Sequence, residues 1–217
     1  MPTKFITLEG GEGTGKSTQA SLLANRLQSL TTGTEVIVTR EPGGSERAER
    51  IRTLLLDGQL PEPTPLTETL LFYAAREDHL NQIIIPALHA GKWVICDRFS
   101  DSTRAYQGVA GGLPEQIINI LDEWVVCKRQ PGLTIVLDLP ASMGLERAAR
   151  RRSEGPNAAT DRFEGLDLKF HRKLRKAFLQ IAENEASRCS VIDANGDKLD
   201  VAGRIWDIVA NRWSLPS

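Results

Sequence analysis

The eight residues GGEGTGKS at positions 10–17 constrain this chain more than any other stretch. They follow an apolar, strand-forming run at residues 5–8 and precede a helical pattern at residues 17–30, which is the setting of a phosphate-binding loop. Glycines let successive N–H groups curl around one anion, and the helix adds its positive end. Lys16 supplies a cation for the β- and γ-phosphates of a nucleoside triphosphate, and Ser17 a hydroxyl for Mg²⁺. The alternative is a glycine-rich turn that contains a lysine by chance, and such a turn would need neither a strand before it nor a helix after it.

Composition narrows the class of protein. A formal net charge of −1, from 27 basic and 28 acidic side chains, argues against a general nucleic-acid binder or a membrane-surface protein. No apolar run approaches the roughly 20 residues that span a bilayer. Cys96, Cys127 and Cys189 show no metal-ligand spacing. We therefore expect a cytoplasmic protein with no nucleic-acid or membrane partner, folded as a single domain over residues 1–217.

Apolar runs alternate with helical patterns along the whole chain, which predicts an α/β fold: a five-stranded parallel sheet with helices on both faces. The run at residues 36–38 is expected to be a buried strand. Residues 67–88 form one long helical pattern in which Pro86 predicts a kink or a division. Residues 100–112 are polar and glycine-rich and predict a loop with a short helix. The expected strands are residues 5–8, 36–38, 93–96, 133–137 and 190–192.

Polar residues follow two of these strands at the edge where open α/β sheets bind ligands. Asp97 and Arg98 come directly after the run 93–96. Asp97 is a candidate to hold Mg²⁺ through water, and Arg98 to grip a phosphate bidentately. Arg40 leaves the run 36–38 in the segment TREPGG and is expected to face the same crevice. A structural salt bridge is the alternative for the pair Asp97–Arg98.

Two further groups of residues suggest an acceptor site and a mobile cover. Phe72 and Arg76 are four apart on one helix, so a ring that stacks on a base and a guanidinium that donates to its carbonyl can share a face. Phe72 taken alone is more typical of a core residue. Arg147, Arg150, Arg151 and Arg152 are typical of a solvated helix face. Beside a phosphate loop they can instead form a lid that brings positive charge and excludes water.

Several segments together resemble bacterial thymidylate kinase, in order and in spacing. They are GGEGTGKS at 10–17, TREPGG at 39–44, LLFYAAR at 70–76, DRF at 97–99, STRAYQG at 102–108 and DRFE at 161–164. The resemblance runs from about residue 4 to residue 210. The phosphate loop is common to many families, whereas TREPGG and LLFYAAR are specific together.

The resemblance implies a P-loop NTPase fold with a small arginine-rich lid over residues 141–164, ATP and thymidylate (dTMP) as substrates, and a homodimer. It implies that Phe72 stacks on thymine, that Arg76 donates to a thymine carbonyl, and that Arg98, with Arg40, holds the monophosphate. It places Thr103 and Gln107 near the base, Tyr106 at the sugar's 2′ position and Glu12 between the sugar and the phosphate. The ATP-binding residues would be Gly10, Gly11, Glu12, Gly13, Thr14, Gly15, Lys16 and Ser17.

Some family members carry an arginine where this chain has Gly13, so the missing charge is expected from the lid. Arg151 or Arg152 is the first choice, followed by Arg147 and Arg150. The implied catalytic set is therefore Lys16, Arg98, Arg151, Arg152 and Glu12.

The implied reaction transfers the γ-phosphoryl group of ATP to dTMP in dTTP biosynthesis. No strong general base is needed, because the acceptor phosphate is itself nucleophilic, and His79, His89 and His171 are interpreted as structural or surface residues away from the crevice. Kinases of other nucleotides or nucleosides, a nucleotide-hydrolysing switch and a nucleic-acid-associated ATPase remain the alternatives at this stage.

Overall fold

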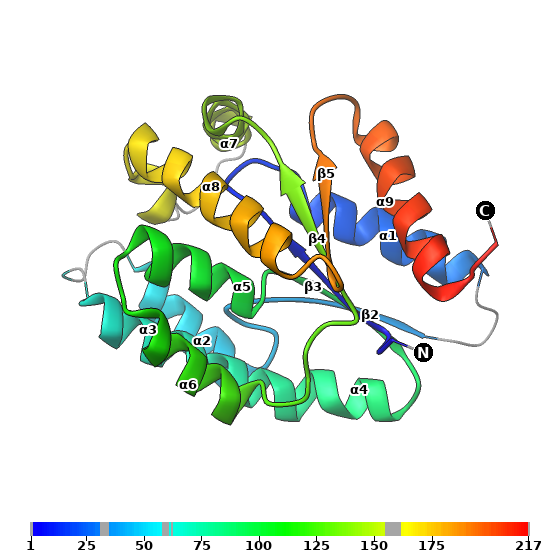
Figure 1. The fold of residues 1–217 in the computed structure, drawn as a ribbon, viewed down its shortest axis with the longest axis horizontal. Helices are drawn as coiled ribbons and strands as arrows, with labels where there is room; N and C mark the ends of the chain where they lie inside the picture. Colours follow the sequence, from blue (N-terminus) through cyan, green and yellow to red (C-terminus); the bar gives the residue numbers. More distant parts are fainter. Residues whose placement is uncertain (1, 31–34, 58–60, 62, 155–161, 217) are drawn as a thin grey trace.

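A computed structural model describes residues 2–30, 35–57, 61, 63–154 and 162–216. Its centre is a sheet of five parallel strands in the order β2-β3-β1-β4-β5 (Figure 1). The chain leaves β1 for the edge strand β2, returns through β3, and then crosses to the other side of β1, so the strand order reverses beside β1. Such a reversal opens a ligand-binding crevice at the carboxyl ends of the strands. The strands are β1 (Phe5–Glu9), β2 (Val36–Arg40), β3 (Trp93–Asp97), β4 (Leu133–Asp138) and β5 (Cys189–Asp193).

Helices cover both faces of the sheet, as the sequence predicts (Figure 1). Alternate residues of β1 are buried on opposite faces: Ile6 and Leu8 pack with α1 and α9, whereas Phe5 packs against η1, α4 and the end of α6. A further cluster joins α8 and η2 to Val136 of β4. The helices are α1 (Lys16–Leu30), α2 (Glu46–Leu56), α3 (Pro65–His79), η1 (Leu80–Ile84), α4 (Ile85–His89), α5 (Ser100–Thr103), η2 (Arg104–Ala110), α6 (Glu115–Val125), α7 (Ala141–Glu154), η3 (Arg162–Gly165), α8 (Leu168–Asn184) and α9 (Lys198–Trp213).

The expectation that residues 36–38 form a fully buried strand is wrong. The strand β2 lies at the edge of the sheet, and Val38 is 47% exposed. An apolar run shows that a strand is β-prone, but its position in the sheet depends on pairing with β3, which the sequence pattern does not specify.

The long helical pattern at residues 67–88 is divided into α3, the π-helical turn η1 and α4. The wider turn ends two residues before Pro86, whose ring and missing N–H disrupt regular α-helical bonding, so the predicted division is confirmed. Leu70 and Ala74 of α3 are exposed, whereas the polar Arg76 and His79 are buried, so the buried face of this helix is not its most apolar one.

Residues 100–112 are more helical than the sequence suggests. The short helix α5 runs directly into η2, so that helical backbone continues from Ser100 to Ala110. Glu9, at the end of β1, accepts hydrogen bonds from the N–H groups of Phe99 and Ser102 at the start of this segment. A distant carboxylate thus supplies the N-terminal cap that the local sequence lacks.

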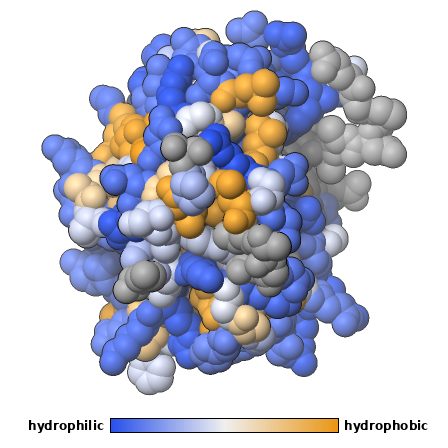
Figure 2. Space-filling view, turned by 90° about the vertical axis from the view of Figure 1, so that its right-hand side faces the viewer, coloured by the Kyte–Doolittle hydropathy of each residue, from blue (hydrophilic) through white to orange (hydrophobic). Residues whose placement is uncertain are grey.

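The surface on the side of the C terminus is mostly hydrophilic, with apolar side chains gathered in small areas (Figure 2). Among the described helices, none combines the length and the apolar character needed to cross a bilayer.

Candidate active site

The phosphate loop lies between the end of β1 and the start of α1. The Lys16 ammonium group donates to the carbonyl oxygens of Gly11 at 2.7 Å and Gly10 at 3.2 Å, so the side chain folds over the loop. Burial and nearby Arg98 lower the pKa of Lys16 to about 8. The loop therefore holds its cation in place before any anion arrives.

Gly13 has a structural reason to be a glycine. Its φ of +67° is left-handed, and a Cβ atom there would lie 1.9 Å from the carbonyl oxygen of Gly144 in the first turn of α7. A Cβ on Gly144 would in turn lie 2.3 Å from the carbonyl oxygen of Glu12. The phosphate loop and α7 therefore touch backbone to backbone, and an arginine at position 13 would require α7 to move away.

Ser17 and Asp97 form a pair of oxygen groups suited to Mg²⁺. The Ser17 hydroxyl donates to a carboxylate oxygen of Asp97 at 2.5 Å, and both residues line the cavity described below. Hydroxyl and carboxylate oxygens are ligands that Mg²⁺ accepts while it keeps several waters. The residues present therefore fit this ion.

Glu12, Arg98 and Tyr106 link the loop to the other half of the site. Glu12 accepts hydrogen bonds from the Arg98 guanidinium at 2.7 Å and the Tyr106 hydroxyl at 2.5 Å. Burial alone would raise the pKa of Glu12, but Arg98 and Lys16 outweigh it and lower the pKa to about 2. Glu12 is therefore ionised, and it neutralises Arg98, the cation expected to hold the acceptor phosphate.

Arg98 stands at the end of β3 with a left-handed φ of +70°, which is uncommon for a residue other than glycine. Its guanidinium also donates to the Gly10 carbonyl at 2.9 Å and to the Ser102 hydroxyl at 3.3 Å. Ser102 in turn donates to Glu9 at 2.6 Å. Contacts on several sides therefore hold this unusual backbone, as is common at functional sites.

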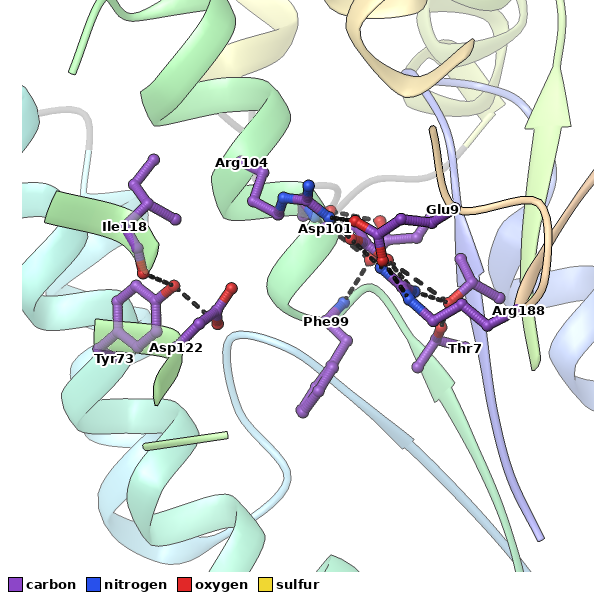
Figure 3. Close-up of polar contacts among 12 residues, drawn as sticks. Thr7, Glu9, Tyr73, Phe99, Asp101, Arg104, Ile118, Asp122 and Arg188 are labelled. Atoms are coloured by element: carbon purple, nitrogen blue, oxygen red, sulfur yellow. Dashed lines mark hydrogen bonds and ion pairs between the residues drawn. The ribbon is translucent and has the colours of Figure 1, made fainter. Parts of the chain in front are cut away.

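A buried ionic network lies behind Glu9 (Figure 3). Asp101 accepts hydrogen bonds from Arg188 at 2.7 and 2.8 Å and from Arg104 at 3.0 Å. Arg188 also donates to the Thr134 hydroxyl, which bonds to that of Thr7 on β1. Burial raises the pKa of Asp101, but its two arginines outweigh this effect and lower it. The network ties the start of α5 to strands β1 and β4 and to the loop before β5.

A cavity of about 640 Å³ opens beside these groups, large enough for small ligands. Phe72 lines it, together with Arg76, whose side chain is 1% exposed. Arg76 donates to Glu41 at 2.8 Å through Nε and to the Thr103 hydroxyl at 3.0 Å through Nη2. Nη1 of Arg76 is buried without a hydrogen-bond partner among the described residues. One nitrogen of this guanidinium therefore remains for a ligand.

Other predicted acceptor residues line the same cavity but already bond to the protein. Gln107 donates to Glu68 at 2.7 Å. Arg40 donates to both carboxylate oxygens of Glu49, and its side chain is 55% exposed. Arg40 therefore lies at the rim of the cavity, where its contact with a ligand would have to replace or extend an ion pair.

The lid arginines fall into two groups. Arg151 lines the cavity and donates to Glu164 at 2.8 Å, while Arg152 donates to the other oxygen of Glu164 at 2.5 Å. Phe163, next to Glu164, packs edge-to-face on Tyr106 with ring centroids 5.2 Å apart. Arg147 instead donates to the Ala194 carbonyl. The helix α7 ends at Glu154, and Asp161 of the DRFE segment lies outside the described residues.

The structure brings nearly all predicted site residues to one cavity. Gly10, Gly11 and Thr14 instead line a neighbouring cavity of about 20 Å³, together with Glu12. Arg152 lies one ion pair away, through Glu164. The predicted site residues that line the 640 Å³ cavity are Glu12, Gly13, Gly15, Lys16, Ser17, Arg40, Phe72, Arg76, Asp97, Arg98, Thr103, Tyr106, Gln107 and Arg151.

Sequence reasoning missed the carboxylates that hold these side chains: Glu9, Glu41 and Glu164. Glu41 and Glu164 lie inside the quoted TREPGG and DRFE segments, and Glu9 is a charged residue that ends an apolar strand, which is a usable signal. The interpretation of His79 as a structural residue fits the structure, because His79 is fully buried, bonds to Glu41 and is not among the residues that line the large cavity. The expectation that His171 lies away from the crevice is wrong, because His171 lines the small cavity beside the phosphate loop together with Glu12.

Comparisons with known proteins agree with this geometry. The model of the thymidylate kinase family matches residues 8–205. A thymidylate kinase of Bradyrhizobium diazoefficiens is 52% identical over 209 residues, which cover 96% of this chain and 90% of that protein. A thymidylate kinase of Caulobacter vibrioides is 50% identical over 211 residues, with coverage of 97% and 98%.

A solved structure extends the likeness from sequence to fold. The crystal structure of thymidylate kinase from Ehrlichia chaffeensis superposes with a TM-score of 0.74 at 34% identity, covering 94% of this chain and 97% of that one. Sequence, fold and cavity thus lead to one conclusion: the chain belongs to the thymidylate kinase family.

Proposed function

We propose that this protein transfers the γ-phosphoryl group of ATP to the 5′-phosphate of dTMP, giving ADP and thymidine diphosphate for dTTP biosynthesis in the cytoplasm. The observation that carries this proposal is one cavity with the Lys16 loop on one side and the buried Arg76, with its unpartnered Nη1, on the other. A phosphate loop alone binds a triphosphate, whereas the second side supplies a place for a base.

On the donor side, the N–H groups of the loop and Lys16 bind the ATP phosphates. Ser17 and, through water, Asp97 would hold Mg²⁺, and that ion would supply positive charge for the β- and γ-phosphates. The hydrogen bond between Ser17 and Asp97 keeps these two groups together in advance. Little reorganisation is then needed when the nucleotide binds.

On the acceptor side, the dTMP phosphate takes the place of Glu12 as the main anion at Arg98, and Glu12 turns toward the sugar. An oxygen of that phosphate attacks the γ-phosphorus, and the bond to the ADP oxygen breaks. Phe72 stacks on thymine, Arg76 donates to its carbonyl through Nη1, and Thr103 and Gln107 border the base. Tyr106 restricts the sugar's 2′ position. Positioning and charge compensation supply the catalysis, since the phosphate needs no general base.

The lid, residues 141–164, supplies the positive charge that the phosphate loop lacks because position 13 is a glycine. Arg151 lines the cavity, and Arg152 is linked to Arg151 because both arginines form ion pairs with Glu164. We propose that Arg151 contacts the transferred phosphoryl group, with Arg152 as the second candidate. Arg147 has a structural role, because it donates a hydrogen bond to the Ala194 carbonyl. We also propose that residues 1–217 form one domain.

We further propose a homodimer through α2, α3 and α6. Large apolar side chains are exposed on these helices, and Trp124 is 82% exposed. Exposed apolar groups on adjacent elements are typical of a protein interface. Sedimentation tests this: Trp124→Asp should shift a dimer to a monomer, and an unchanged mass would contradict the assignment. The exposed residues are Leu54, Leu66, Leu70, Ile120 and Trp124.

An acceptor panel tests the function. ADP release is measured with ATP, Mg²⁺ and either dTMP, dUMP, UMP, dCMP, GMP, thymidine or no acceptor. We expect kcat/KM to be highest for dTMP. A preference for another acceptor would reassign the substrate, and hydrolysis without acceptor that outpaces transfer would favour a nucleotide-hydrolysing switch.

A further inference from the structure

The guanidinium of Arg76 is fixed on several sides. Nε donates to Glu41 at 2.8 Å and Nη2 to Thr103 at 3.0 Å. The rings of Tyr73 and Phe99 lie 4.7 and 5.3 Å from its central carbon, within cation–π range. Nη1 alone among its nitrogens has no partner in the described part of the chain.

Glu41 is itself held from behind. Its second oxygen lies 3.1 Å from Nδ1 of His79, and Nε2 of His79 lies 2.7 Å from the Thr39 hydroxyl. An ionised carboxylate only accepts hydrogen bonds, so Nδ1 carries the proton and donates to Glu41. Both ring nitrogens of His79 are thus engaged, Nδ1 by Glu41 and Nε2 by the Thr39 hydroxyl.

This chain of contacts is closely packed. The side chains of Glu41 and His79 are 4% and 0% exposed. A Cβ on Gly44 would lie 2.3 Å from Nε2 of His79, so the backbone of the TREPGG segment closes directly over the imidazole. A group enclosed in this way has little freedom to reorient, and it limits the freedom of its partner Glu41.

We propose that Glu41 is a positioning residue for acceptor recognition: it turns Arg76 so that Nη1 faces the acceptor base, and His79 and Thr39 hold Glu41 in that orientation. The inference rests on the proposed contact between Arg76 and the base. A guanidinium donates and never accepts, so a fixed Nη1 favours a carbonyl over an amino group at the same place on a pyrimidine. Discrimination between dTMP and dCMP then depends on Glu41, which needs no contact with either.

The test is Glu41→Gln, which keeps the size of the side chain and removes its charge. We expect KM for dTMP to rise about 10- to 100-fold, as for other groups that orient a ligand-binding side chain. KM for ATP should stay within about twofold, because the phosphate loop does not depend on Glu41. The ratio of kcat/KM for dTMP to that for dCMP should fall. An unchanged KM for dTMP would overturn the proposal.

Asp78→Asn is the matched control, because Asp78 is also a buried carboxylate on α3, one residue before His79. Asp78 bonds to Ser45 at 2.6 Å and Arg47 at 3.1 Å and is not among the residues that line the cavity. Both variants should lower the melting temperature. Only Glu41→Gln should change KM for dTMP, and equal changes in both would reduce Glu41 to a general structural role.

Two further variants separate this inference from the proposed function. Thr39→Val keeps the shape of the side chain and removes only the hydroxyl behind His79, so it should raise KM for dTMP about two- to tenfold, the cost of one hydrogen bond. Arg76→Lys tests the base contact itself. If Arg76→Lys leaves KM for dTMP unchanged, the assigned role of Arg76 fails. If Arg76→Lys raises KM and Glu41→Gln does not, only the positioning role fails.

Discussion

The two sides of the cavity are built in opposite ways. The donor side is one continuous segment, residues 10–17, whose Lys16 is held by carbonyl groups of the same loop. The acceptor side takes its side chains from β2, α3, the end of β3 and the segment α5–η2. Buried carboxylates hold them: Glu9 bonds to Ser102, Glu12 to Arg98, Glu41 to Arg76 and Glu68 to Gln107.

This difference shows where each side gets its rigidity. Backbone geometry fixes the donor side, so its residues need to be adjacent in sequence. Ion pairs and hydrogen bonds between distant segments fix the acceptor side, and they are strong only because they are buried and well bonded. Substitutions on the donor side should therefore change the rate of transfer, whereas substitutions on the acceptor side should change acceptor affinity.

The largest effect is expected from Lys16→Ala. Loss of one charge placed toward the transferred phosphoryl group should lower kcat by roughly 10²- to 10³-fold. KM for dTMP should change far less, since the hydrogen bonds of Lys16 to the described residues go to its own loop. Steady-state kinetics with each substrate varied in turn measures both. Near-normal turnover would remove the functional distinction between the two sides.

Phe72→Ala tests the acceptor side by itself. Loss of base stacking should weaken dTMP binding by about 1–3 kcal/mol, with little change in ATP affinity. Isothermal titration calorimetry with each nucleotide measures the two affinities separately. If both affinities fell together, Phe72 would serve the core of the protein and not the base.

Gly144→Ala tests how closely the donor side depends on α7. The new Cβ would lie 2.3 Å from the Glu12 carbonyl oxygen, so we expect overpacking to lower the free energy of unfolding by about 1–3 kcal/mol. Gly203→Ala in α9 is the control, because a Cβ there meets nothing within 4 Å. It should raise stability by about 0.5–1 kcal/mol, the gain in helix propensity. Denaturant unfolding compares them, and equal effects would contradict the close contact.

The smallest effect on activity is expected from Glu9→Gln. Burial and the charge of Asp101 raise the pKa of Glu9, so the folded protein keeps this proton above pH 4.5, where the unfolded chain has released it. The stability contributed by Glu9 therefore falls as pH rises above that value. The amide reproduces the protonated form and its bonds to Phe99 and Ser102, so kcat should stay within about threefold.

The pH dependence of stability distinguishes charge from shape at Glu9. Between pH 5 and 8 the wild-type protein should lose more stability than Glu9→Gln, since the variant has no proton to release there. Thermal melts across this range measure the difference. A strong loss of activity in the variant would show that the acceptor side needs the negative charge of Glu9 and not only its hydrogen bonds.

Sequence reasoning succeeded where a pattern is local and failed where partners are distant. The phosphate loop, the alternation of strands and helices and the division near Pro86 were predicted, because glycine spacing, hydrophobic period and proline act on adjacent residues. The edge position of β2 was missed, and the extent of the helical segment that begins at Ser100 was underestimated. Each depends on a partner far along the chain, namely β3 for β2 and Glu9 for Ser100.

The sequence by itself determined the chemistry of this protein: the phosphate loop with Lys16 and Ser17, the cations and rings of the acceptor segments, and the resemblance that linked them. Only the tertiary structure decided how these groups are oriented. It buried Arg76 beside Glu41 and His79, paired Arg98 with Glu12, and set Gly13 against Gly144. Charge and hydrogen-bonding capacity belong to each residue, but direction and burial come from neighbours that folding alone brings together.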